Sequence, residues 1–380
     1  MKKNRLFTPG PTMVPESVLL EMARPIEHHR TAGFRKMFEE AHGLLQYLFQ
    51  TKAQCVTITG SGTAAAEAAI VGCCPTGHKA LVINNGKFAE RWEKVCETFN
   101  INHTTLPIEW GHGANAEVVT KALQADREID TVICVQSETS TTALSDIEGI
   151  AKVTRERGAI LIVDGITAVG AIPVKMDDWG VDVYITGSQK ALMLPPGLGF
   201  AAVSDRAWER IDSATTPALY NDLKAYRKSL EGWDVPYTPA VTLIRGLLHV
   251  LRDIKLRGLE SIWAETALLA RATREAAKAM NLKTFAVDPT DSVTAVMVPE
   301  GVDEPALRKE MRERHGFHIA GGQGHLKGRI VRLSHMGYVD AFDTLGVIAA
   351  MELTLIRQGF KLEPGSGITA AQKVLAEANK

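Results

Sequence analysis

Short apolar runs alternate with longer amphipathic stretches between residues 51 and 203. The runs that predict strands cover residues 53–59, 80–83, 131–136, 159–164, 181–186 and 199–203. Several are continuous and rich in β-branched residues, which is typical of parallel strands buried on both faces. Helices are predicted between them, at 63–72, 88–99 and 149–158. This alternation predicts an α/β domain with a mostly parallel sheet and helices on both faces.

The pattern changes after this region, and residues 242–280 read as long helices. Shorter elements follow, with strands predicted at 293–298, 316–319 and 328–333 and helices at 304–315 and 341–358. They predict a second, smaller α+β domain. After Glu363, a Pro-Gly-Ser-Gly segment leads into a tail rich in Ala and Lys, which we expect to form a weakly attached helix.

The composition is that of a globular protein with about two domains. The chain has 380 residues, of which 45% are hydrophobic and 23% charged, and its net charge is -1. This balance gives no overall attraction to nucleic acid or to an acidic membrane. No apolar run reaches the roughly 18 residues of a membrane-spanning helix, and the basic N-terminus lacks the apolar stretch of a secretory signal. We therefore expect a cytoplasmic protein.

Five cysteines, Cys55, Cys73, Cys74, Cys96 and Cys134, all lie in the first 134 residues. None is spaced as in a CxxC zinc or redox motif, and their number is odd. We expect reduced thiols rather than a disulfide framework, and no metal site.

The strongest chemical signal is a carboxylate and an amine that follow two predicted strands. Asp164 ends the run 160–163, and Lys190 follows the run 181–186 within Gly-Ser-Gln-Lys. The carboxyl ends of parallel strands form the ligand crevice of such sheets. A lysine that forms a Schiff base and an aspartate that keeps a pyridine nitrogen protonated are what pyridoxal 5'-phosphate (PLP) requires. A strand-end salt bridge between Asp164 and Lys190 is the alternative.

Three other segments carry weaker signals. Ser61, Gly62 and Thr63 lie between a strand and an alanine-rich helix, where free N–H groups can bind a phosphate or be capped in the ordinary way. Phe88 begins a helix and could stack on a cofactor ring or belong to the core. Arg332 lies inside an apolar strand, where it needs a carboxylate from a substrate or from the protein itself.

Together these residues resemble the class V aminotransferase family, in the branch of alanine–glyoxylate and serine–glyoxylate (serine–pyruvate) aminotransferases. The most specific segment is Gly-Ser-Gln-Lys-Ala-Leu followed by Pro-Pro-Gly. The matching segments follow the family's order along nearly the whole chain: Thr8-Pro9-Gly10-Pro11-Thr12, Ser61-Gly62-Thr63, Glu138-Thr139-Ser140-Thr141, Val163-Asp164, Ser188-Gln189-Lys190-Ala191, Tyr237-Thr238-Pro239 and Arg332.

The resemblance implies a PLP-dependent enzyme of fold type I, with a seven-stranded, mostly parallel sheet in its large domain and a smaller C-terminal α+β domain. It implies an N-terminal arm at residues 1–15 that contributes to the active site and a large PLP-binding domain at 16–255. A small domain at 256–362 and a tail at 363–380 would follow.

The resemblance also implies roles for individual residues. Lys190 and Asp164 would be catalytic, and Gly10 and Arg332 would bind the substrate. The residues expected to bind the cofactor are Ser61, Gly62, Thr63, Phe88, Thr139, Asp164, Ile166, Gln189, Lys190 and Thr238, the last from the neighbouring subunit. Two positions depart from the family, which often has Trp in place of Phe88 and His or another residue in place of Thr63. The segment His28-His29-Arg30 would line the entrance of the site, or else form a solvated turn.

The activity implied is transfer of the amino group of alanine, serine or aspartate to glyoxylate or pyruvate, in a homodimer with shared active sites. Alternatives are another class V reaction, such as 2-aminoethylphosphonate–pyruvate transamination, and a non-catalytic subunit associated with a soluble hydrogenase, as some similar sequences have been described. A cysteine desulfurase would need a cysteine on a late loop, and none follows Cys134.

Overall fold

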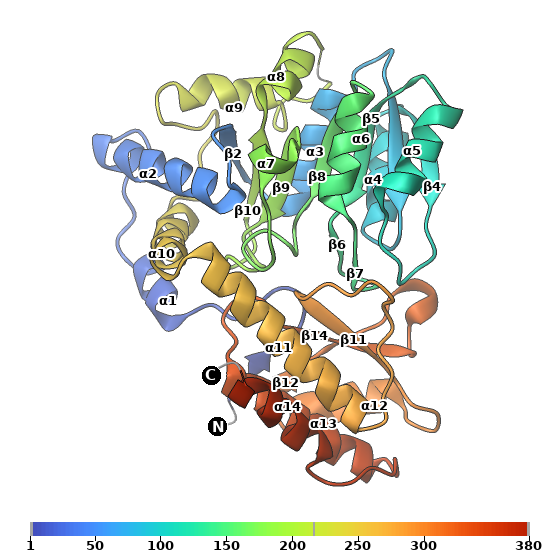
Figure 1. Ribbon diagram of the computed structural model, residues 1–380. Helices are drawn as coiled ribbons and strands as arrows, with labels where there is room; N and C mark the ends of the chain where they lie inside the picture. Colours follow the sequence, from blue (N-terminus) through green and yellow to red (C-terminus); the bar gives the residue numbers. More distant parts are fainter. Residues whose placement is uncertain (1–2, 216, 378–380) are drawn as a thin grey trace.

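A seven-stranded sheet lies at the centre of the larger domain of the computed structural model, which describes residues 3–215 and 217–377 (Figure 1). The strand order is β2-β10-β9-β8-β5-β3-β4. The strands are β2 (Gln54–Thr59), β3 (Lys79–Asn84), β4 (Asn102–Pro107), β5 (Ile129–Val135), β8 (Ile160–Asp164), β9 (Val183–Gly187) and β10 (Leu198–Val203). Only β10 runs antiparallel to its two neighbours. The prediction of a mostly parallel, seven-stranded α/β sheet is confirmed.

Burial explains which strands the sequence pattern could find. Every residue of β8, β9 and β10 is buried, so these strands are continuous apolar runs with few exceptions. The edge strand β4 is different, because most of its Asn-His-Thr-Thr-Leu-Pro sequence is half-buried or exposed. It has no apolar run, and the sequence pattern did not predict it.

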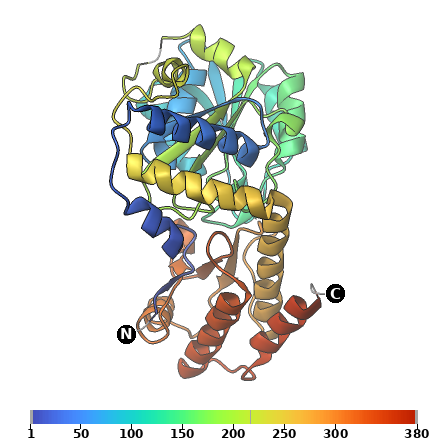
Figure 2. The same cartoon turned by 90° about the vertical axis from the view of Figure 1, so that its left-hand side faces the viewer.

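Helices cover both faces of this sheet (Figures 1 and 2). Figure 2 shows α2 (blue) and α10 (yellow) side by side across one face, with α1 beside α10. The helices of the larger domain are α1 (Glu16–Met22), α2 (Ala32–Phe49), α3 (Gly62–Cys73), α4 (Ala89–Thr98), α5 (Ala116–Ala125), α6 (Ile147–Glu156), α7 (Met176–Trp179), α8 (Asp205–Asp212), α9 (Leu223–Leu230) and α10 (Val241–Arg257). A two-stranded ribbon of β6 (Ser137–Glu138) and β7 (Ala143–Leu144) follows β5.

The helix α11 (Leu259–Ala279) connects the two domains. The chain turns sharply from α10 into α11 at Gly258, whose φ of 81° favours glycine. The first turns of α11 place Leu259 and Ile262 in the hydrophobic core of the larger domain, whereas Ala272 and Ala276 belong to the smaller core. One continuous helix therefore holds both cores in a fixed relation.

The smaller domain is built on the antiparallel sheet β11-β14-β13. The N-terminal arm joins it, because β1 (Arg5–Leu6) pairs in parallel with β12 (Phe317–His318). Its remaining elements are β11 (Val293–Met297), α12 (Glu304–Glu313), β13 (Ala320–Gly321), the 3-10 helix η1 (Gly324–Leu326), β14 (Ile330–Ser334), α13 (Ala341–Arg357) and α14 (Ser366–Glu377). The expected domain boundaries at residues 255 and 362 remain predictions, and the ends of the arm (1–2) and of the tail (378–380) lie outside the described residues.

The C-terminal tail forms the expected helix, but the expectation that it would be weakly attached is wrong. Helix α14 packs along α11 (Figure 1), and its Ala371 and Val374 are buried in the smaller core. The Glu352 carboxylate accepts hydrogen bonds from the N–H groups of Gly365 (3.1 Å) and Gly367 (2.6 Å). A small apolar face among Ala and Lys residues is enough to attach the helix, since burial depends on spacing rather than on overall composition.

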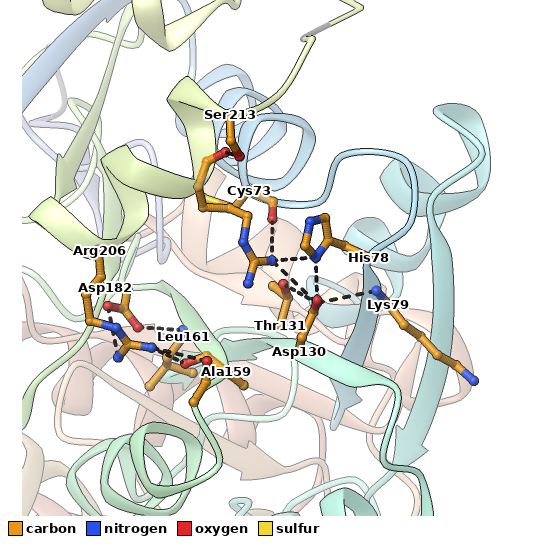
Figure 3. A network of polar contacts seen from close by, with 12 residues as sticks. Cys73, His78, Lys79, Asp130, Thr131, Ala159, Leu161, Asp182, Arg206 and Ser213 are labelled. Carbon is orange, nitrogen blue, oxygen red and sulfur yellow. Dashed lines mark hydrogen bonds and ion pairs between the residues drawn. The ribbon is translucent and has the colours of Figure 1, made fainter.

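A network of polar contacts lies at the amino-terminal ends of the parallel strands (Figure 3). Asp164 and Lys190 lie at the opposite ends of these strands. The buried Asp182 carboxylate accepts the N–H of Leu161 (3.0 Å) and the hydroxyl of Ser204 (3.1 Å). Asp130 pairs with His78 and lies 3.5 Å from Arg210 of α8. These contacts fix α8 to the sheet at this edge.

All five cysteines are buried and free. Burial raises the pKa of the Cys73 and Cys134 thiols to about 12, so these thiols stay protonated and unreactive near neutral pH. Within residues 3–215 and 217–377, no helix is both long enough and apolar enough to cross a membrane.

Candidate active site

Two neighbouring strand ends bring Asp164 and Lys190 to the same edge of the sheet. Strands β8 and β9 are parallel and paired, and Asp164 is the last residue of β8. Lys190 follows the end of β9 at Gly187 by three residues. Both side chains are buried, with exposed fractions of 3% for Asp164 and 8% for Lys190. The structure therefore brings together the two residues that the sequence singled out first.

Asp164 is held by one donor on each carboxylate oxygen. Its Oδ1 accepts the N–H of Ile166 at 2.8 Å, and its Oδ2 accepts the indole N–H of Trp92 at 3.1 Å. Burial raises the pKa of Asp164 to about 7, and these two hydrogen bonds act against that rise. A further cation placed beside this carboxylate would therefore lower its pKa.

Lys190 is held by the N-terminal arm. Its Nζ donates to the backbone oxygen of Pro9. The Thr12 hydroxyl donates to the Lys190 backbone oxygen (2.7 Å), and the Thr12 N–H donates to the oxygen of Gln189 (3.2 Å). Burial lowers the pKa of Lys190 to about 8, with the nearby Asp164 acting in the opposite direction. At pH 7 the protonated form therefore still predominates, and the neutral, nucleophilic form becomes abundant as the pH approaches 8.

The amino end of α3 lies beside this pair and carries Ser61, Gly62 and Thr63. Ser61 is the N-cap residue, yet its side chain makes no capping hydrogen bond within the described part of the chain, so the ordinary capping alternative is not adopted. A Cβ carbon at Gly187 would lie 3.2 Å from both the Gly62 nitrogen and the Gln189 Oε1. The Gln189 amide and the start of α3 therefore converge on one small space.

Phe88 is half-buried at the start of α4 and is in contact with Arg91. The Arg91 guanidinium lies 5.0 Å from the centre of the Phe88 ring and donates to the Thr63 hydroxyl at 3.1 Å. Glu138 is fully buried and accepts the N–H groups of Phe88 and Ala89, each at 3.1 Å. Phe88 is therefore held from both its backbone and its ring, and it is not a residue of the hydrophobic core.

Thr139 connects the large domain to Arg332. Its hydroxyl hydrogen-bonds the hydroxyl of Thr167 at 3.0 Å, and its backbone oxygen accepts from Arg332 Nη1 at 2.7 Å. Ile166 lies next to Gly62, since a Cβ carbon at Gly62 would lie 2.7 Å from the Ile166 Cδ1. The structure thus places Thr139, Ile166 and Arg332 near one another, and the roles that the resemblance implies for them remain predictions.

An internal salt bridge was the alternative to substrate binding for Arg332. Within residues 3–215 and 217–377, Arg332 forms no such salt bridge and instead bonds backbone oxygens. Its Nε and Nη2 donate to the backbone oxygen of Gly321 (3.0 and 2.8 Å), and Nη1 donates to Thr139. A guanidinium has five N–H donors, so two remain available for another acceptor. Burial lowers the pKa of Arg332 to about 10, which leaves it charged at neutral pH.

Two predicted segments are not joined to this constellation within one chain. Thr238 is exposed before α10, and no described contact links it to Lys190 or to the start of α3. Residues 28–30 lie in the connection between α1 and α2, where His28 and His29 stack on each other with ring centres 4.6 Å apart.

Four residues that contact the predicted site residues had no predicted role: Arg91, Trp92, Glu138 and Thr167, of which only Glu138 lies in a segment that resembles the family. A signal existed for two of them, because Arg91 and Trp92 follow Phe88 by three and four residues and must share its helix face. Glu138 and Thr167 gave no periodic signal, since they lie on a short ribbon and in a turn.

Comparison with known proteins supports one family. The family described as Aminotransferase class-V matches residues 5–339. A soluble hydrogenase small subunit of Synechococcus sp. is 39% identical, over 99% of each chain. The serine–glyoxylate aminotransferase of Methylorubrum extorquens is 34% identical, over 99% of this chain and 96% of the relative. The crystal structure of ureidoglycine–glyoxylate aminotransferase from Bacillus subtilis superposes with a TM-score of 0.94 at 27% identity, over 99% of each chain.

Proposed function

The chain belongs to the class V aminotransferase family, which is PLP-dependent, and we propose that it transfers the amino group of a small amino acid to a 2-oxo acid. The proposed donors are alanine, serine or aspartate, and the proposed acceptors are glyoxylate or pyruvate. The observation that carries the proposal is the buried pair of Asp164 and Lys190 at adjacent strand ends, with Arg332 bound to Thr139 beside them.

The residues present fit PLP at three places. The free N–H groups at the start of α3 can donate to a phosphate. The Gln189 side-chain amide lies beside them, its Oε1 buried without a hydrogen-bond partner within the described residues, and its NH2 group would be the donor to the phosphate. Gly10 and Gly62 allow Lys190 and Ile166 to lie close to the site, because a Cβ carbon at either glycine would overlap these side chains. Asp164 is a buried carboxylate with a raised pKa. A pyridinium cation beside it would lower that pKa, and the ionised carboxylate would in turn keep the ring nitrogen protonated.

Roles follow for the residues around the cofactor. We assign the phosphate to Ser61, Gly62, Thr63 and Gln189, and the ring hydroxyl to Thr139. Phe88 and Ile166 would enclose the ring from its two faces. When bound, PLP supplies an electron-accepting ring that stabilises negative charge on the α-carbon of an amino acid.

Lys190 has the properties of the proton carrier. Its Nζ would remove the proton from the α-carbon of the amino donor as a base and pass it to the cofactor carbon as an acid. In the second half of the reaction it would carry a proton back from that carbon to the α-carbon of the product amino acid. A pKa of about 8 suits both tasks, because the protonated and neutral forms are both populated near neutral pH. Its contact with Pro9 O and the burial of the site limit exchange of this proton with water.

Arg332 is the proposed receptor for the substrate carboxylate. Its two remaining N–H donors match the two oxygens of a carboxylate. Amino acid and 2-oxo acid each carry an α-carboxylate, so one receptor serves both halves of the reaction. Gly10 of the N-terminal arm is the other proposed substrate-binding residue, and it lies directly against the Lys190 side chain.

We propose that the working form is a homodimer with shared active sites. Thr238 is exposed, lies beside Tyr237, and is separate from the constellation of its own chain. A second chain related by a two-fold axis could bring this hydroxyl to the phosphate site, and two-fold dimers are the commonest closed assembly.

The hydrogenase relative is the reason to keep a second candidate, a non-catalytic subunit. An amine with its pKa near 8 and a buried carboxylate at adjacent strand ends, with a charged arginine of β14 nearby, favour the transaminase. A phosphonate donor would require further cations close to the substrate, and Arg91 is already bound to Thr63.

Absorbance spectroscopy of the purified protein tests the proposal. Wild-type protein mixed with PLP should show a band near roughly 410–430 nm that borohydride abolishes, as expected for PLP bound to a lysine. Candidate amino donors should then be assayed against glyoxylate, pyruvate and 2-oxoglutarate. Protein that binds PLP without any transamination would favour the non-catalytic subunit, and protein that forms no such band would contradict both the cofactor and the reaction.

A further inference from the structure

Trp92 is the only side chain among the described residues that hydrogen-bonds the Asp164 carboxylate. Its Nε1 donates to Oδ2 at 3.1 Å, and its indole is 1% exposed. The other oxygen, Oδ1, accepts a backbone N–H from Ile166. Each carboxylate oxygen can accept two hydrogen bonds, so Oδ2 can bind Trp92 and a ring nitrogen at the same time.

The first turn of α4 ties Trp92 to the rest of the site. Phe88, Arg91 and Trp92 are three and four residues apart and therefore share one helix face. Phe88 and Arg91 contact each other, and Arg91 reaches the Thr63 hydroxyl. The buried Glu138 accepts two N–H groups at the start of α4, which have no partner inside the helix. A shift of this turn would move all of these contacts together.

We propose that Trp92 is a positioning residue that holds the Asp164 carboxylate in place and in its ionised form for the cofactor's ring nitrogen. The part that concerns the ring rests on the proposed function. Any buried indole needs an acceptor for its N–H, and a backbone oxygen would satisfy it. Here the acceptor is the carboxylate on whose charge the proposed reaction depends.

The charges around Asp164 show why one neutral donor matters. The groups that face it are Glu138 from β6, Arg91 from α4, Lys190 after β9, Cys134 of β5 and Tyr184 of β9. Burial and Glu138 raise the pKa of Asp164, whereas Ile166, Arg91 and Trp92 lower it. Cys134 and Tyr184 remain protonated below pH 10 because burial raises their pKa values. Removing the Trp92 N–H should therefore raise the pKa of Asp164 further.

The first test uses the protein without cofactor and measures its melting temperature between pH 4 and pH 8. Because the folded pKa of Asp164, about 7, lies above its ordinary value of 3.8, stability from this group is present at low pH and is lost as the pH rises through 7. Trp92→Phe keeps an aromatic ring but removes the N–H. Its loss of melting temperature relative to wild type should grow by about 2–4 °C from pH 4 to pH 8.

Trp208→Phe is the matched control. Trp208 is also buried, on α8 at the opposite edge of the sheet, and its Nε1 has no hydrogen-bond partner within the described residues. The decrease in melting temperature caused by Trp208→Phe should not depend on pH. In an Asp164→Asn background, Trp92→Phe should lose its pH dependence. If the decrease in melting temperature caused by Trp92→Phe is as independent of pH as that caused by Trp208→Phe, the proposed link between Trp92 and Asp164 is overturned.

The second test uses the protein loaded with PLP. Trp92→Phe should retain the cofactor but lose about tenfold in kcat, with its KM for the amino acid unchanged and the acid limb of its pH profile moved to higher pH. If the loss of kcat in the double variant equals the full sum of the losses, as free energies, of Trp92→Phe and Asp164→Asn, the proposal is overturned, because the effects of two residues that act as one unit are not additive. Failure of the wild-type protein to bind PLP would reject the proposed function and the ring's part in this proposal, while the melting experiment would still decide the contact of Trp92 with Asp164.

Discussion

Gly10 packs so closely against Lys190 that a Cβ carbon at Gly10 would overlap the lysine Nζ and lie 2.7 Å from its Cδ. The φ angle of Gly10 is 131°, a conformation that other residues rarely adopt. The N-terminal arm therefore reaches the amine only because this residue has no side chain. Since the arm also pairs with β12 of the smaller domain, this contact connects the amine to both domains.

Gly10→Ala should displace Lys190 and weaken its reaction with PLP while leaving the fold intact. The measurement is the amplitude of the PLP absorbance band together with the melting temperature. Gly43→Ala is the control, because Gly43 lies inside α2 with open space around it and should gain about 0.5–1 kcal/mol of stability. Full PLP binding by Gly10→Ala would show that the arm does not constrain Lys190.

Lys190→Ala should abolish transamination without unfolding the protein. In the wild type, the rate of reaction with PLP should rise with pH and level off above about pH 8, because only the neutral amine attacks and burial lowers its pKa to about 8. An exposed lysine, Lys175, offers a control substitution to Ala that should change neither property. Near wild-type turnover by Lys190→Ala would reject the assignment.

Asp164→Asn should lower the rate by several orders of magnitude, because the ring nitrogen loses the anion that keeps it protonated. Binding of the cofactor through its phosphate should persist. Asp182→Asn is the matched control, since Asp182 is also buried but at the opposite ends of the strands, and it should affect stability rather than rate. A loss smaller than about tenfold, roughly 1.4 kcal/mol, would show that Asp164 is not the partner of the ring.

Arg332→Ala should weaken binding of both the amino acid and the 2-oxo acid, by roughly 2–5 kcal/mol for the loss of a buried charge pair. Arg332→Lys keeps the charge but not the paired donors, so it should restore only part of the affinity. The measurement is KM for both substrates. Unchanged values for both would indicate another carboxylate receptor.

Thr238→Ala should weaken retention of PLP although Thr238 makes no described contact with the site of its own chain. Mixing Thr238→Ala chains with Lys190→Ala chains should give hybrid dimers in which one site has both residues intact, and activity should reappear. Sedimentation at nanomolar concentration gives the assembly state. A fully active monomer would contradict shared sites.

The sequence by itself determined the elements and the central chemistry of this protein. Apolar runs such as residues 160–163 predicted buried strands because a strand covered on both faces must be apolar throughout. Asp164 and Lys190 followed from the same pattern, since polar residues directly after such strands must lie at the carboxyl edge of a parallel sheet. The exposed strand β4 escaped prediction because its side chains face water.

Only the tertiary structure decided which residues support that chemistry. Trp92 meets Asp164 across 72 positions of sequence, and Gly10 meets Lys190 across 180, so no local period could connect them. Glu138 reaches the start of α4 from a ribbon too short to leave a pattern. Hydrogen-bond geometry and close packing depend on the positions of whole elements in space, and those positions are determined when the two hydrophobic cores form around the sheets.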